Sequence, residues 1–229
     1  MRHFLPFFIA AFSICCVSFV ACSNSVPELI SLDAIVVYDY KSLQEEPVQR
    51  LSVFAQSSEG TERVMRLEIS FPEEKLFWLI DKPLILNNGS KLWAGSPGLM
   101  SPYFSAFPQG QYQVIYTDLA GKTATGQFQL DYEEVPEPPL EQPIFSIQQE
   151  QQEGDDGSSE GSPDEPIRRI ALFSELNGRG TLLFFEKAWD DWKDFSDIKN
   201  SYHEAKSLRI CLDYPNRQVL YLLPAHNLE

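Results

Sequence analysis

The sequence predicts a mainly β protein: an antiparallel β-sandwich, a C-terminal strand-helix-hairpin portion, and a disordered acidic insert between them. This prediction rests on three observations: short runs of alternating apolar and polar residues, turns rich in Gly and Asn between these runs, and one long acidic stretch that lacks such runs. Of the 229 residues, 43% are hydrophobic and 13% aromatic, which is enough to build a packed core.

The sandwich is expected over residues 32–132. Its clearest strand is Met65–Phe71, where apolar residues alternate with polar ones, the pattern of a half-buried strand. A hairpin is expected where Asn88 and Gly89 separate two apolar runs, because both residues tolerate positive φ. Shorter strands are expected at residues 34–38, which are β-branched and aromatic, and at 51–55, where Leu51, Val53 and Ala55 alternate with polar partners.

A second hairpin is expected over Gly110–Leu130, with the turn at Asp118–Lys122 and Gly121 suited to positive φ. Tyr112, Val114 and Tyr116 would share one face of its first strand. This hairpin resembles the last two strands of immunoglobulin-like and fibronectin-like domains. The resemblance implies an antiparallel sandwich of about a hundred residues.

Residues 133–166 are expected to form an acidic Pro-, Gln- and Glu-rich linker or long loop. Between Asp131 and Pro166 there are twelve acidic residues and no Lys or Arg, so this stretch carries most of the net charge of −15. Such a composition cannot bury enough apolar surface to offset the entropy of ordering. Because no cluster of Lys and Arg occurs either, a nucleic-acid partner is not expected.

Residues 167–229 are expected to form a second, smaller β-rich portion. Two strands would flank the turn at Asn177–Gly180, and a final hairpin would close over Tyr214–Arg217. Ala188, Trp189, Trp192 and Phe195 recur at helical spacing and predict one short amphipathic helix. About sixty residues are marginal for an independent fold, so we expect this portion to pack on the first domain. Two separate domains are the alternative.

The N-terminus has the layout of an export signal over residues 1–21: a basic start at Met1-Arg2-His3, then an uncharged apolar stretch. The run Phe19-Val20-Ala21-Cys22 resembles the lipobox of bacterial lipoproteins, although Phe19 departs from the usual Leu. That resemblance implies lipidation of Cys22 by acyl chains such as palmitate, attachment to the bilayer, and a location in the periplasm or on the cell surface. Residues 22–31 would be a tether. Simple cleavage near Ala21 and a retained helix stay open.

The sequence contains no recognisable catalytic or metal-binding motif. Cys15 and Cys16 join Cys22 in the N-terminal stretch, which leaves Cys211 as a single core thiol without a disulfide partner. His203 and His226 lack the spacing of a helical zinc motif. We therefore predict no catalytic residues, no metal and no cofactor.

The Gly- and Pro-rich stretch 95–108 is expected to be a loop, and it carries five large apolar side chains. These either pack beneath the sandwich or form an exposed binding surface. The leading hypothesis is a non-catalytic envelope lipoprotein that binds a protein or peptide partner or has a structural role. The alternative is an envelope hydrolase whose carboxylates are scattered in the sequence. The five residues are Leu99, Met100, Tyr103, Phe104 and Phe107.

Overall fold

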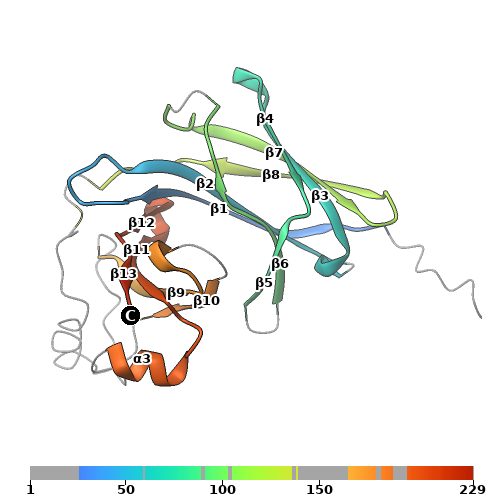
Figure 1. Cartoon of the computed structure of the whole chain (residues 1–229). Helices are drawn as coiled ribbons and strands as arrows, with labels where there is room; N and C mark the ends of the chain where they lie inside the picture. The colour runs from blue at the N-terminus through green and yellow to red at the C-terminus, as the bar shows by residue number, and fades with distance from the viewer. Residues whose placement is uncertain are drawn as a thin grey trace, which may run out of the picture.

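The computed structural model describes residues 26–58, 60–88, 91–102, 105–135, 138, 165–178, 182–187 and 195–228. The predicted signal peptide, Cys22 and most of the acidic segment lie outside these ranges. The described chain is mainly β, as expected, and its strands form two sheets (Figure 1). None of its helices is long and apolar enough to cross a bilayer.

The larger sheet joins the two portions of the chain. Its strands follow the order β10-β9-β11-β12-β1-β2-β6-β5, with β13 paired to β11. All the pairs are antiparallel except β1 with β12, where Val36 lies opposite Val219 in a parallel register. The strands are β1 (Leu29–Asp39), β2 (Val48–Ser57), β5 (Leu84–Asn88), β6 (Lys91–Leu99), β9 (Ile167–Phe173), β10 (Leu182–Lys187), β11 (Ser207–Tyr214), β12 (Val219–Leu222) and β13 (His226–Asn227).

The smaller sheet has the order β4-β3-β7-β8 and is antiparallel throughout. The hairpin expected over residues 110–130 is present as β7 and β8. Its turn is held by the Asp118 carboxylate, which accepts hydrogen bonds from the backbone N–H groups of Ala120 (2.9 Å) and Lys122 (2.8 Å), and Gly121 has φ 78°. The strands are β3 (Val64–Phe71), β4 (Leu76–Asp81), β7 (Gly110–Asp118) and β8 (Thr123–Leu130).

The two sheets enclose a common core to which strands of both contribute. Leu51 and Val53 of β2 are fully buried from one side, and Leu67 and Ile69 of β3 from the other. Between them stands an aromatic stack in which the Tyr112 ring lies 5.0 Å from Phe128 and 4.8 Å from Phe71. Each such buried side chain stabilises the fold by roughly 1.5–3 kcal/mol relative to exposure.

Short helices connect or flank the strands. The predicted helix at residues 188–195 falls almost wholly outside the described residues, and the helix that is described begins where it ends. That helix, α3, packs the buried Ile198 against the core. The elements are η1 (Thr61–Arg63), η2 (Pro72–Glu74), η3 (Leu176–Gly178), η4 (Pro215–Arg217) and α3 (Phe195–Ser201).

Two predicted boundaries are corrected. The stretch 95–99 is the second half of strand β6, not the start of a loop, since Leu99 pairs with Leu51 of β2 and Gly95 with Phe54. Pro97 is tolerated because the register shifts beside it, where one backbone donor is not needed. Strand β1 begins at Leu29, inside the predicted tether, because Leu29 and Leu32 reach across to contact Gly126 of β8.

Candidate binding groove

The predicted aromatic loop contributes mainly to the core. Leu99 is 9% exposed and Phe107 is 2% exposed, with the Phe107 ring 6.1 Å from that of Trp78. Met100 is partly buried, and its backbone carbonyl accepts a hydrogen bond from Trp78 Nε1 (2.8 Å). Tyr103 and Phe104 lie outside the described residues. Leu99 and Phe107 are therefore buried and offer no exposed apolar side chain for a binding surface.

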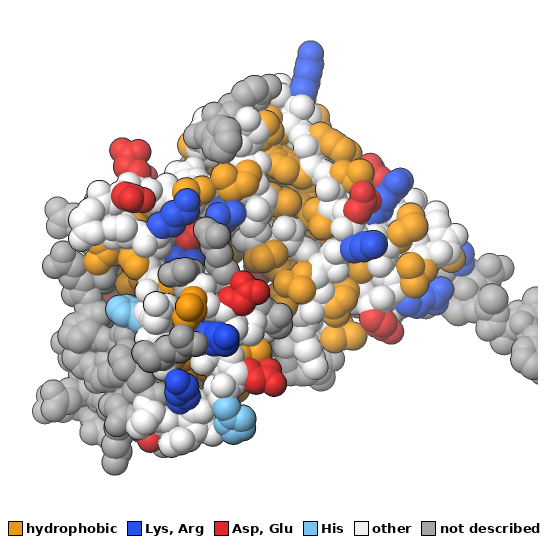
Figure 2. Space-filling model, in the orientation of Figure 1, with side chains coloured by type: hydrophobic (Ala, Val, Ile, Leu, Met, Phe, Trp, Pro, Cys, Tyr) orange, Lys and Arg blue, Asp and Glu red, His pale blue; other side chains and the backbone are white. Residues whose placement is uncertain are grey.

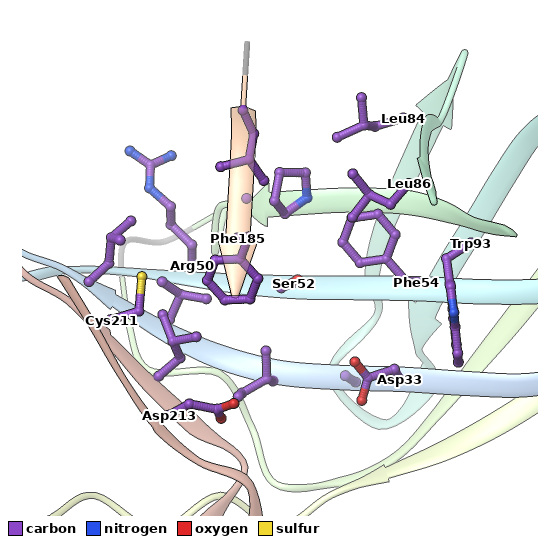
Figure 3. A pocket seen from close by; sticks show the side chains of 18 of the residues that line it. Asp33, Arg50, Ser52, Phe54, Leu84, Leu86, Trp93, Phe185, Cys211 and Asp213 are labelled. Carbon is purple, nitrogen blue, oxygen red and sulfur yellow. The ribbon is translucent and has the colours of Figure 1, made fainter. Parts of the chain in front are cut away.

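The described part of the chain instead contains a large open groove on the other face of the nine-stranded sheet. The groove holds about 2650 Å³. Alternation along the strands creates it: Val36 and Val53 point into the core, whereas Val37 and Phe54 point into the groove. We call it the sheet groove, and it is lined by residues of β1, β2, β5, β6, β9, β10, β11 and β12 and, from the smaller sheet, of β8. Figure 3 shows the part where β10 crosses in front of β1 and β2.

One wall of the sheet groove is apolar and partly open to solvent. Leu84 of the edge strand β5 is 48% exposed, and Phe185 of the opposite edge strand β10 is 40% exposed. Phe54 lies between Phe185 and Trp93, with Leu86 beside it (Figure 3). In the orientation of Figure 1, hydrophobic side chains gather over the region of β5 and β6 (Figure 2). The strands thus present apolar surface on both sides of the opening.

Gly95 shapes this wall. It lies opposite Phe54 of β2 in the strand register, and the Cβ of a side chain at Gly95 would clash with the backbone carbonyl oxygen of Val53 and lie only 2.7 Å from Cδ1 of the Phe54 ring. The missing side chain lets the ring lie over β6 within the groove. The glycine that suggested a loop in the sequence is therefore the position where two strands need a close approach.

Ion pairs close one end of the sheet groove. The Asp39 carboxylate accepts from Arg209 at 2.6 Å and from Arg50 at 3.0 Å. The Arg209 side chain is only 7% exposed and also donates to the backbone carbonyls of Tyr40 (2.9 Å) and Leu222 (3.0 Å). This arginine fastens β11 to the ends of β1 and β12, so its role is structural.

A second ion pair joins the neighbouring strands β9 and β11 within the groove lining. Arg169 Nε donates to the Asp213 carboxylate at 2.8 Å, and the Arg169 guanidinium sits 5.6 Å from the centre of the Phe185 ring. This cation–π contact orients Phe185 toward the opening.

Asp33 differs from Asp39 and Asp213, the two carboxylates of the sheet groove that are paired with arginines. Among the described residues, it has neither an ion-pair nor a hydrogen-bond partner. Its side chain is exposed, yet the surrounding walls remove enough water to raise the pKa of the carboxyl, and the charge of Asp213 raises it further. Its cross-strand neighbour in the register is Phe54.

The groove offers little of what catalysis requires. Burial raises the pKa of the Cys211 thiol to about 12, which leaves it protonated and unreactive at neutral pH. Asp39 and Asp213 are bound to arginines, which leaves Asp33 and Glu175 as the lining carboxylates without an ion pair among the described residues. No group of three or more His, Cys, Asp or Glu within the described ranges could hold a metal ion. The arrangement is suited to binding.

Sequence reasoning missed the sheet groove because its residues come from strands far apart in the chain. Asp33, Phe54, Trp93 and Phe185 belong to β1, β2, β6 and β10. One signal was available in the sequence: the residues of each strand that alternate with the core-facing ones. In β3 these residues are polar, as expected for a face in solvent. In β1 and β11 they are largely apolar or form ion pairs, which indicates a covered face. Comparison of the chain with models of known families, with characterised proteins and with solved structures finds no match.

Proposed function

We propose that this chain is an exported lipoprotein with a non-catalytic role, which binds an apolar component of the cell envelope in the sheet groove. The observation that supports this most is the groove itself, open to solvent between Leu84 and Phe185 and floored by apolar side chains. Its volume of about 2650 Å³ exceeds the roughly 300–1,000 Å³ of ordinary small-ligand pockets. An extended ligand, such as a segment of an envelope protein or peptide, fits such dimensions.

The proposed anchor is the acylated Cys22. Two or three acyl chains, at about 0.8 kcal/mol per buried methylene, hold a protein stably at a bilayer where one chain does not. Because β1 begins at Leu29, the connection from Cys22 spans at most roughly 25 Å when fully extended. The β-rich body would therefore stay next to the periplasmic or outer surface to which it is attached.

We further propose that the chain is organised as a sandwich over 32–132, an acidic connector over 133–166, and a C-terminal portion over 167–229 that extends the larger sheet. The parallel pair of β1 with β12 supports this, since it makes the C-terminal strands a continuation of the first portion. The acidic connector, with its excess of carboxylates, would be repelled by an anionic membrane surface.

Metabolic labelling with an alkyne analogue of palmitate tests the anchor. The unmodified chain should incorporate the label and fractionate with membranes, whereas Cys22→Ala should do neither. A matched Cys16→Ala variant should behave as the unmodified chain. Failure of the unmodified chain to take up label would refute lipidation of Cys22.

Binding of Nile red, a neutral dye whose emission brightens in apolar surroundings, tests the groove. Ser52 lies on the floor of the sheet groove between Phe185 and Phe54, so Ser52→Trp should obstruct this part of the groove and weaken dye binding by roughly tenfold or more. Thr125 is exposed on the outer face of the smaller sheet, and Thr125→Trp serves as the matched control with binding unchanged. Equal binding to both variants would show that the dye does not occupy the groove.

A further inference from the structure

Asp33 stands in a defined row of the sheet groove. The register places Asp33 opposite Phe54, Phe54 opposite Gly95, and Gly95 opposite Leu84 at the edge of the sheet. Trp93 lies two residues before Gly95 and therefore on the same face, next to this row. The carboxylate, both aromatic side chains and the apolar edge line one part of the groove (Figure 3).

The charges of the groove are otherwise largely matched within the chain. Asp39 is paired to two arginines and Asp213 to one. Of the described charged residues that line the groove, this leaves Asp33, Lys41 and Glu175 without an ion pair, and only Asp33 has aromatic neighbours in its row. Lys41 follows strand β1 and Asp33 lies within it, so these two of the three unmatched charges are separated along the strand.

We propose that the Asp33 end of the sheet groove binds the cationic group of a ligand whose body is apolar. The inference rests on the proposed binding function and adds the chemical class of the ligand. The ligand would carry an ammonium or guanidinium group on an aliphatic or aromatic body, with the charge at Asp33 and the body along Phe54, Trp93 and Leu84.

Three physical effects favour such a ligand. A carboxylate partly removed from water is stabilised when a cation supplies the interaction that water has lost, which is also why burial raises the pKa of Asp33. The faces of Trp and Phe rings attract organic cations within about 6 Å of their centres. The exposed part of Leu84 gains by burial against the ligand body. An anionic ligand would be repelled by the unmatched negative charge of Asp33. A neutral ligand would remove water from the carboxylate without replacing the lost interaction, so both should bind more weakly.

Displacement of Nile red by three probes with the same apolar body tests this: 4-phenylbutylammonium, 4-phenylbutanol and 4-phenylbutanoate. At pH 7 the ammonium probe should displace the dye at roughly tenfold lower concentration than the alcohol, and the carboxylate should be the weakest. Asp33→Asn should abolish this preference while leaving the alcohol unchanged. Asp81→Asn, which removes an exposed carboxylate from β4, should leave the preference as it is.

Each outcome decides between the two proposals. If all three probes displace the dye equally, or if Asp33→Asn keeps the preference, the cation inference is wrong and the binding groove still stands. If the dye binds Ser52→Trp as well as it binds the unmodified chain, the groove is not the site and both proposals fail.

Discussion

Two hairpins of the molecule, β3–β4 and β11–β12, share one turn and differ in their surroundings. Each turn starts with a proline, Pro72 or Pro215, and ends at a residue in the left-handed region, Lys75 with φ 56° or Gln218 with φ 51°. In both turns the N–H of that last residue donates to the proline carbonyl at 3.2 Å. Local sequence therefore builds the same loop twice.

The core-facing sides of the two hairpins also match. When the prolines are aligned, Leu67, Ile69 and Phe71 correspond to Ile210, Leu212 and Tyr214, and all six are buried in the common core. The opposite faces diverge. On β3, Arg66, Glu68 and Ser70 remain partly exposed, whereas every residue of β11 is buried.

The difference comes from what covers the second face of each strand. β3 lies between β4 and β7 and β11 lies between β9 and β12, but the second face of β3 is partly exposed, whereas that of β11 lies on the sheet groove. Alternation determines which side chains enter the core, but it does not determine what packs against the opposite face of the strand. Variants at corresponding positions of the two hairpins measure how much the packing on that opposite face contributes to stability and to protection from solvent.

The largest difference is expected between Arg209 and Arg66, which occupy corresponding positions six residues before the two prolines. Arg209→Met removes a buried guanidinium that pairs with Asp39 and serves three backbone carbonyls, which should cost about 3–5 kcal/mol. Arg66→Met removes a half-exposed pair with Glu68 and should cost about 0–1 kcal/mol. Urea unfolding measures both. Losses equal within 1 kcal/mol would show that the groove side of β11 adds no stability of its own.

A smaller difference is expected between Cys211 and a cysteine placed at the corresponding position 68. The thiol of Cys211 is buried and its pKa is raised to about 12 by loss of water, so almost no thiolate forms at pH 8. In chains whose Cys15, Cys16 and Cys22 are changed to Ser, Glu68→Cys with Cys211→Ser should react with a disulfide reagent at least roughly 100-fold faster than Cys211 does.

The sign of the pH dependence follows from the raised pKa. Labelling of native Cys211 should remain slow from pH 7 to pH 9 and become fast only in urea, where the thiol regains its ordinary pKa. Rapid labelling in the absence of urea would show that β9 and β10 open readily over the groove side of β11.

The distinction between local alternation and long-range packing explains which features could be predicted from the sequence. The strand at 65–71 and the hairpin at 110–130 follow from local alternation and turn residues, and both are present. The sheet groove depends on the parallel pair of β1 with β12, two strands separated by most of the chain, and no local pattern encodes that contact. Gly95 was assigned to a loop because its requirement, close approach to the backbone of Val53 and the ring of Phe54, comes from another strand.

The smallest effects are expected at the last residue of each turn, and here the signs should be opposite. Lys75 pays a conformational cost of roughly 1 kcal/mol for its left-handed backbone, so Lys75→Gly should stabilise the protein by about 0.5–1 kcal/mol. Gln218 has the same backbone, yet its side chain accepts a hydrogen bond from the N–H of Asp131 (2.7 Å) and donates one to the carbonyl of Gln129 (3.1 Å).

Gln218→Gly would relieve the same strain and lose both bonds, each contributing about 0.5–1.5 kcal/mol, so a net loss of roughly 1 kcal/mol is expected. Gln218→Lys, which places the residue of the first turn in the second, keeps the strain and loses only the bonds, and should be the least stable of the three. Thermal unfolding of the three variants resolves these steps. Stabilisation by Gln218→Gly equal to that by Lys75→Gly would mean that the contacts of Gln218 with the end of β8 do not help to join the two sheets. The two hairpins would then differ only in the burial of their second face, which is partly exposed in β3 and buried in β11.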